Sequence, residues 1–251
     1  MTLSWSIRRR LMYSGGTLLV ALCVAVFIWL KFFNPPPTCF DNKQNGDETG
    51  IDCGGSCTLV CSSDVHQPVV LWTRVFPDGP HTYTAMAYVQ NNNGETGAHN
   101  VHYSFQLLDA NNKLVVEKDG VMDIPPVLTI PMLVPAVDVG NGTVVRALFA
   151  FNDTPVWERV PHGSVPAIRI VNQTLASDAT RLDATITNDS LADQANVVVV
   201  AVLFDANGVA QTASRSVIPS LASRSSTNVV FTWPQGVPDV ARAEISVLPS
   251  F

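Results

Sequence analysis

The longest run of apolar residues lies near the N-terminus, where residues 11–30 (LMYSGGTLLVALCVAVFIWL) carry no charge. Basic residues flank this run at Arg8, Arg9, Arg10 and Lys31. Twenty helical residues, each rising about 1.5 Å, span about 30 Å, which matches the hydrocarbon core of a bilayer. The pattern therefore predicts a transmembrane helix over residues 11–33, with membrane lipid as its partner.

Three kinds of N-terminal segment share this pattern. A cleaved signal peptide needs a shorter apolar region and small residues at its cleavage site, which Lys31-Phe32-Phe33 does not offer. A lipoprotein signal normally places a small residue before the modified cysteine, whereas Leu22 precedes Cys23 here. An uncleaved signal anchor fits best. Its arginines keep residues 1–10 in the cytoplasm, so the rest of the chain is expected outside a single-pass cell-membrane helix.

Beyond the anchor, the apolar positions alternate with polar ones in short runs. From Val69 onward these runs are separated by Gly, Pro and Asn, and a helical period is essentially absent. A period of two predicts β-strands, and many short strands predict a sandwich. We therefore expect a mainly β protein with two tandem immunoglobulin-like or fibronectin III-like sandwiches, at residues 66–161 and 162–251.

An internal repeat supports the count of two domains. Four pairs of segments are parallel, at 84–91 and 181–188, 105–111 and 201–207, 124–125 and 218–219, and 149–151 and 231–233. Their offsets are about 97, 96, 94 and 82 positions, and the last value predicts a longer loop in the first copy, around residues 131–141. In each copy an Asp-Ala-Asn segment predicts a hairpin, with Asn207-Gly208 at one tip.

The same alternation predicts which residues of the second sandwich point inward. The predicted core residues are Leu182, Ala184, Ile186, Val198, Val200, Val202, Phe204, Val230 and Trp233. Residues 196–204 are apolar at nearly every position, so the pattern does not fix which face of this strand is the inner one.

A polar, cysteine-rich segment, residues 34–65, joins the anchor to the first sandwich. Three prolines after Asn34 favour an extended spacer. Four of the five cysteines follow, at Cys39, Cys53, Cys57 and Cys61. An even number of cysteines outside the cytoplasm predicts two disulfides, with the pairing left open. Structural zinc sites usually use C-x2-C pairs, which this spacing lacks.

Calcium is the second metal ion considered for residues 34–65, which we call the neck. Hard oxygen donors stand at Asp41, Asn45, Asp47 and Asp52. Counted from Asp41, Asn45 and Asp52 occupy positions 5 and 12 of an EF-hand-like loop, but Lys43 occupies position 3, where a ligand belongs. The other interpretation is a polar loop rich in turns, with glycines that permit positive φ.

Two short strings resemble known families. Residues 44–57, QNGDETGIDCGGSC, resemble a module of many secreted and surface proteins, and this resemblance implies a cross-linked connector outside the cytoplasm. Residues 105–109, FQLLD, and 201–205, AVLFD, are similar to the signature of FxLYD domains. That resemblance implies small β-sandwiches of cell-surface proteins, a family to which no reaction is attached.

Charge and candidate chemistry narrow the function. All 21 acidic residues follow Lys31, together with 11 of the 15 basic ones, so this part of the chain carries a net charge of −10, which argues against nucleic acid as a partner. His99 and His102 are expected on opposite faces of a strand rather than on one metal. Trp72, Trp157 and Trp233 are spaced like core anchors, with an aromatic ligand platform as the alternative.

No nucleophile, acid–base pair or phosphate loop is recognisable in the sequence. The sequence therefore predicts a membrane-anchored, extracytoplasmic protein without catalysis or cofactor. We expect its sandwiches to act as an interaction module for an envelope protein. A passive spacer is the alternative, and an enzyme is a more distant one.

Overall fold

The computed structural model describes residues 5–32, 36–126, 128–161 and 163–248. The start of the predicted cytoplasmic segment, the end of the predicted anchor at Phe33 and the beginning of the linker at Asn34-Pro35 lie outside these ranges. So does His162, where the second sandwich was predicted to begin. The chain divides into two compact units, residues 1–57 and 58–251.

The N-terminal helix, α1, runs over Trp5–Phe32. Among the described residues it is the helix long and apolar enough to cross a membrane, and none of its side chains is buried by protein. The helix begins before the predicted boundary at residue 11, so the three arginines lie within it. Arginine is a good helix former, and no proline or glycine stands between Trp5 and Arg10 to end the helix there.

The described part of residues 58–251 is built of strands, joined by turns and one short 3-10 helix, Ser62–Asp64. The first seven strands are β1 (Val69–Pro77), β2 (Thr82–Gln90), β3 (Thr96–Leu108), β4 (Leu114–Ile124), β5 (Thr129–Asp138), β6 (Arg146–Phe151) and β7 (Trp157–Arg159). The remaining strands are β8 (Ile168–Leu175), β9 (Arg181–Asn188), β10 (Gln194–Asp205), β11 (Ala210–Leu221), β12 (Ser226–Thr232) and β13 (Val240–Leu248). The predicted mainly β architecture is confirmed.

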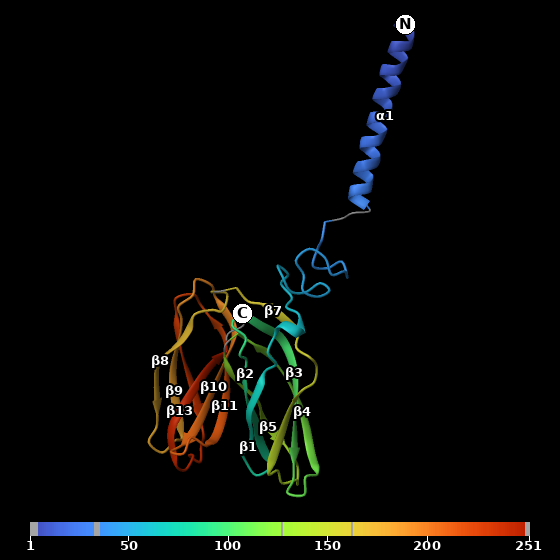
Figure 1. The fold of residues 1–251 in the computed structure, drawn as a ribbon. Coiled ribbons are helices and arrows are strands. Elements are labelled where there is room, and N and C mark those ends of the chain that lie inside the picture. The colour runs from blue at the N-terminus through green and yellow to red at the C-terminus, as the bar shows by residue number, and fades with distance from the viewer. Residues whose placement is uncertain (1–4, 33–35, 127, 162, 249–251) are drawn as a thin grey trace. The chain divides into compact units, whose positions relative to one another are not determined.

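The strands form two sandwiches of the same strand order (Figure 1). In the first sandwich, one sheet has the order β1-β2-β5 and the other has the order β4-β3-β6, with β7 added to β3. In the second, the orders are β8-β9-β12 and β11-β10-β13. All of these pairings are antiparallel. Apart from β7, each strand of the first sandwich has a counterpart at the same place in the second.

The predicted hairpins are present, and an aspartate organises each of them. Oδ1 of Asp109 accepts the backbone N–H groups of the residues two and four positions further on, at 2.8 and 2.9 Å. Oδ1 of Asp205 does the same at 2.9 and 2.8 Å. Gly208 has φ +76° at the second tip, and Asn112 has φ +63° at the first. Asparagine tolerates this left-handed conformation better than most residues, which explains how it replaces glycine.

A buried asparagine fixes the loop after the second strand of each sandwich. The Nδ2 atom of Asn91 donates to the carbonyl oxygens of Thr96 and Pro125, both at 2.9 Å. The Nδ2 atom of Asn188, which is fully buried, likewise donates to the carbonyl oxygens of Ala192, Leu221 and Ala222. Each asparagine thus links two segments that lie far apart in the chain.

One of the four predicted parallels is wrong. Residues 149–151 lie in β6, whereas residues 231–233 include the end of β12, which corresponds to β5. The true counterpart of β6 is β13, whose first residue stands 94 positions after that of β6. The longer loop predicted around residues 131–141 is mostly strand β5. The wrong assignment arose because both segments have two aromatic residues two positions apart. This spacing puts both side chains on one face of a strand, so it does not identify a particular strand.

The predicted inner face of β10 is also wrong. The core of the second sandwich contains Leu182, Ala184 and Ile186 as predicted, but β10 contributes Val197, Val199 and Ala201. The predicted inward residues of β10, Val198, Val200 and Val202, are each displaced by one position from the observed ones. Similarly, β12 buries Val229 and Phe231, while the side chain of Val230 is 41% exposed. The physical reason is that β10 is buried on both faces, so its own pattern contains no period.

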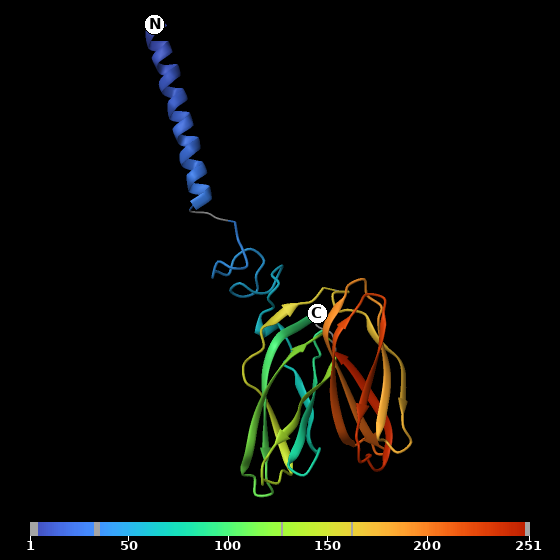
Figure 2. The same cartoon turned by 180° about the vertical axis from the view of Figure 1, so that it is seen from behind.

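The other face of β10 packs against the first sandwich. Val200, Val202 and Phe204 belong to the same buried cluster as Met86 and Tyr88 of β2. Sheet β11-β10-β13 therefore lies on sheet β1-β2-β5, and the two sandwiches stand side by side (Figures 1 and 2). Met86 lies two positions from Tyr88 on β2, so both side chains point away from the core of the first sandwich and toward the second. Met86 is nevertheless completely buried. The interface is thus packed like a protein core.

This packing predicts the effect of shortening Phe204. The side chain is 5% exposed, and the guanidinium carbon of Arg242 lies 4.1 Å from its ring centre. We expect Phe204→Ala to reduce the free energy of unfolding of residues 58–251 by about 3–5 kcal/mol, because it leaves a cavity between the sandwiches. Urea melts measure the change.

Val230→Ala on the solvent side of β12 is the matched control, with an expected cost below about 1 kcal/mol. In an isolated second sandwich, residues 163–251, Phe204 has no first sandwich to pack against. Phe204→Ala should then cost much less than in the paired unit. An equal cost in both contexts would contradict the interface.

Candidate functional site

Disulfides cross-link the neck, as predicted. Cys39 is joined to Cys57, and Cys53 and Cys61 are also disulfide-bonded. A disulfide leaves no thiolate to bind zinc. The described cysteine that stays free is Cys23, in the middle of α1. The segment therefore obtains from covalent bonds the order that its few apolar residues cannot provide.

A cluster of potential metal donors surrounds one disulfide but does not suit a cation. Cys39, Glu48 and Cys57 place their donor atoms within 4.8 Å of one another. Two of these three residues are the partners of the disulfide. The Glu48 Oε1 atom lies 3.5 Å from the Cys57 sulfur, and this is a contact rather than a hydrogen bond because the sulfur carries no proton. Glu48 instead uses Oε2 to accept the backbone N–H of Asn45 at 3.1 Å.

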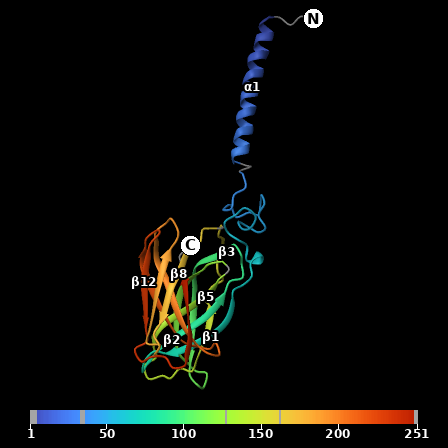
Figure 3. The same cartoon turned by 90° about the vertical axis from the view of Figure 1, so that its left-hand side faces the viewer.

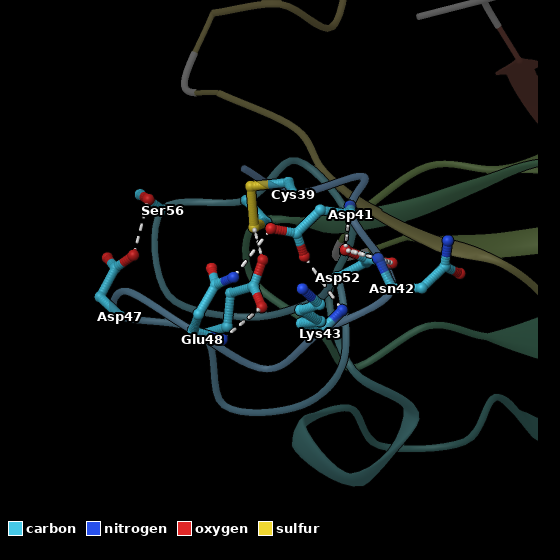
Figure 4. Close-up of a disulfide and its surroundings, with 10 residues drawn as sticks. Cys39, Asp41, Asn42, Lys43, Asp47, Glu48, Asp52 and Ser56 are labelled. Carbon is cyan, nitrogen blue, oxygen red and sulfur yellow. Dashed lines mark hydrogen bonds between the residues drawn. A yellow bond between two sulfur atoms is a disulfide. The ribbon is translucent and has the colours of Figure 1, made fainter. Parts of the chain in front are cut away.

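The carboxylate of Asp52 organises the start of the neck (Figure 4). Its oxygens accept the backbone N–H groups of Asp41 and Asn42, each at 2.9 Å. The carboxylate of Asp41 in turn accepts the N–H of Lys43 at 3.0 Å and the side-chain amide of Asn45 at 2.8 Å. These acidic residues therefore satisfy backbone donors of a loop too short to form regular secondary structure.

Three of the four candidate calcium ligands are brought together, and the fourth is not. Asp41, Asn45 and Asp52 are linked by the bonds just described, whereas Asp47 accepts a hydrogen bond from Ser56 at 2.9 Å in a separate part of the loop (Figure 4). The Oδ1 atom of Asn45 is buried and has no hydrogen-bond partner. Calcium binding at these residues stays a prediction.

The glycines of the distinctive string are required by the path of the backbone. Gly54 and Gly55 have φ +78° and +54°. A Cβ atom on Gly55 would lie 2.1 Å from the carbonyl oxygen of Asp47, and one on Gly54 would lie 1.8 Å from Oγ1 of Thr49. The glycines, the cysteines and most of the acidic residues of this string therefore have a structural role.

His99 and His102 do not form a metal site together. Nδ1 of His99 lies 3.2 Å from Oδ2 of Asp123, while His102 is exposed on β3 opposite Val121. The same carboxylate of Asp123 accepts the N–H of Asn100 at 2.9 Å, and Asn100 has φ +51°. Within the described ranges, no histidine belongs to a group of three potential metal ligands.

The three tryptophans of the sandwiches pack against other residues of the protein. Trp157 is 1% exposed, and Trp233 is partly buried against the second core. Trp72 stacks on Tyr88 with ring centres 4.6 Å apart. The Nε1 atom of Trp157 is buried without a hydrogen-bond partner. Trp157 is therefore a core residue, whereas Trp72 and Trp233 are partly buried at the margins of the two clusters.

Two buried tyrosines, Tyr88 at the sandwich interface and Tyr103 in the core of the first sandwich, have raised pKa values. Burial raises the pKa of Tyr88, and the neighbouring charge of Glu244, whose Oε2 accepts the phenol at 3.4 Å, raises that pKa further. Burial raises the pKa of Tyr103 to about 12. Both phenols remain protonated at neutral pH, so Tyr103 donates to the carbonyl oxygen of Leu133 at 3.3 Å. These tyrosines are structural donors.

A cleft of about 410 Å³ opens where the two sandwiches meet. Its walls come from β4, around Met122 and Asp123, and from β10 and β11, with Val198 and Arg215. The sequence analysis missed this cleft, because no local pattern shows which strands of two domains become neighbours. The lining combines apolar residues with one cation, one carboxylate and the amides of Asn100, Gln194 and Asn196. Among the described lining residues, no nucleophile stands beside a base.

The comparisons with known proteins add little to this geometry. No protein-family model and no curated protein matches the sequence. Among solved structures, 72% of the chain is similar to 29% of the chain in the crystal structure of red sea bream transglutaminase, with 10% identity and a TM-score of 0.21. The chain thus matches less than a third of that enzyme's length. A similarity at this level carries no argument about fold or activity.

The disulfides lead to a direct prediction. In unreduced protein, a thiol reagent should label none of the four neck cysteines, and peptide mapping should recover Cys39 linked to Cys57. Labelling of Cys23 in detergent serves as the positive control. Four labelled neck thiols, or a fragment linking Cys39 to Cys53, would contradict the structure.

Proposed function

We propose that the protein is anchored in the cell membrane by α1 and presents its paired sandwiches outside the cytoplasm as a module that binds an envelope protein. In this proposal the chain performs no catalysis and needs no cofactor. The neck, held by its disulfides, connects the module to the membrane.

The charges beside α1 support the proposed orientation. Arg8, Arg9 and Arg10 lie at the N-terminal end of the apolar stretch, and Lys31 lies in the last turn. The positive-inside rule then favours a cytoplasmic N-terminus. Disulfides in the neck fit an oxidising compartment on the other side. Both arguments support the proposal that the sandwiches lie outside the cytoplasm.

One observation favours an interaction module over a passive spacer. The sandwiches pack sheet against sheet, side by side, rather than end to end (Figure 2). Domains joined end to end would extend the distance that the protein reaches from the membrane, as a spacer requires. Side-by-side packing adds no length, but it creates a broader surface and the cleft lined by both sandwiches. The second sandwich therefore contributes surface rather than reach.

The FxLYD resemblance fits a structural role of its signature residues. Phe105 and Leu107 are completely buried, and Asp109 organises the following hairpin. In the second copy Leu203 is also fully buried, and Asp205 has the same role as Asp109. We propose that the two sandwiches arose by duplication of one such domain. In this proposal the signature residues specify the fold, and residues on the surface determine which partner is bound.

The proposed orientation predicts a protease result. Protease added to intact spheroplasts should digest the sandwiches and leave an epitope placed before Trp5 intact, because the arginines hold that end inside. Lysed spheroplasts, in which both ends are digested, are the control. Survival of the sandwiches in intact spheroplasts would reject the orientation.

The proposed interaction can be tested by photo-crosslinking. A photoreactive side chain is placed singly at Val121, Leu148 or Val171, which are about half exposed and lie on different strands. In native membranes we expect a discrete protein adduct from at least one position, identified by mass spectrometry. The same variants purified in detergent control for self-adducts. If none of the three positions gives an adduct in native membranes, the spacer hypothesis is preferred.

A further inference from the structure

The sandwiches contain four sites of the type Asn-x-Ser/Thr, at Asn141, Asn152, Asn172 and Asn188. This tripeptide is the acceptor for N-linked oligosaccharides in proteins that leave the cytoplasm. An acceptor in a folded protein must expose its side-chain amide, and the amide nitrogen must be free to react. The structure separates the four asparagines by these two requirements.

Two of the asparagines meet both requirements. Asn141 is exposed in the turn between β5 and β6, where the N–H of Gly142 donates to the carbonyl oxygen of Val139 at 2.9 Å. Asn172 is exposed on β8, an edge strand, directly after an irregularity between Ile170 and Asn172 (Figure 3). Neither amide takes part in a hydrogen bond recorded for the described residues.

The other two asparagines do not meet them. Asn188 is fully buried, and its Nδ2 atom donates to three carbonyl oxygens. A sugar on this nitrogen would remove those bonds and has no space. Asn152 is exposed, but its Nδ2 atom donates to Oδ1 of Asp119 at 3.1 Å. Sequence alone treats all four sites as equal.

We propose that Asn141 and Asn172 are N-glycosylation sites and that Asn188 is not. In the reaction, the Nδ2 atom forms a bond to the anomeric carbon of a lipid-linked oligosaccharide. The bond from that carbon to the lipid phosphate breaks, and the phosphate leaves with the electron pair. The amide proton passes to a base of the transferase. The proposal rests on the proposed function, because the sandwiches must lie outside the cytoplasm.

Both sites are compatible with the packing of the sandwiches. The interface uses sheets β1-β2-β5 and β11-β10-β13, whereas Asn141 lies beyond the end of β5 and Asn172 lies on β8. A glycan on Asn172 would also shield a free strand edge. β8 carries a single charged residue, Arg169, and unprotected edge strands tend to pair with other chains.

The test is glycopeptide mass spectrometry of the full chain purified from its own membranes. We expect sugar on the peptides containing Asn141 and Asn172 and none on the peptide containing Asn188. Thr174→Ala should abolish the modification at Asn172, while Thr174→Ser should retain it, because serine keeps the hydroxyl of the acceptor site. The corresponding pair at Thr143 tests Asn141.

Protease accessibility on the same cells separates the two proposals. Accessible sandwiches whose Asn141 and Asn172 are unmodified would overturn the glycosylation sites and leave the orientation standing. Sandwiches that are inaccessible from outside would overturn both. Modification at Asn188 in folded protein would overturn the structural selection among the sites.

Discussion

The structure of the paired sandwiches depends on one strand that is apolar on both faces. Val197, Val199 and Ala201 of β10 fill the core of the second sandwich, and the alternate residues Val200 and Val202 enter the cluster of the first. A strand buried on both sides cannot expose either face to water without losing a large part of its burial free energy. The two domains therefore form one structural unit.

The outer faces of the two remaining sheets differ from the faces that meet between the sandwiches. Sheet β1-β2-β5 of the first sandwich contacts sheet β11-β10-β13 of the second, and these two sheets are not counterparts. A contact between two different faces leaves one face of each kind free, so further copies could in principle be added without limit. However, the free counterparts of these faces carry hydrogen-bonded polar side chains. Gln106 and Glu117 are hydrogen-bonded on sheet β4-β3-β6, and Thr185 bonds Asn228 at 2.9 Å on sheet β8-β9-β12. A third sandwich would have to desolvate these groups.

The neck shows a different balance of forces. Its residues are too few and too polar for a core, so cross-links and side-chain bonds to the backbone determine its conformation. Asp52 accepts two backbone N–H groups, and Gly54 and Gly55 adopt conformations that a Cβ atom would forbid. Residues that look like a ligand set in the sequence are therefore largely used to hold the loop.

The sequence by itself determined the apolar helix, the strand composition and the hairpins, because each depends on neighbours within a few residues. It also indicated that the four neck cysteines form disulfides, but it left open which cysteine pairs with which. It also identified Leu182, Ala184 and Ile186 as core, since β9 has one polar face. Only the tertiary structure decided the register of β10, the counterpart of β6 and the cleft between the sandwiches. It also distinguished exposed Asn172 from buried Asn188. The reason is physical: which face of a doubly apolar strand belongs to which core depends on contacts between residues far apart in the chain.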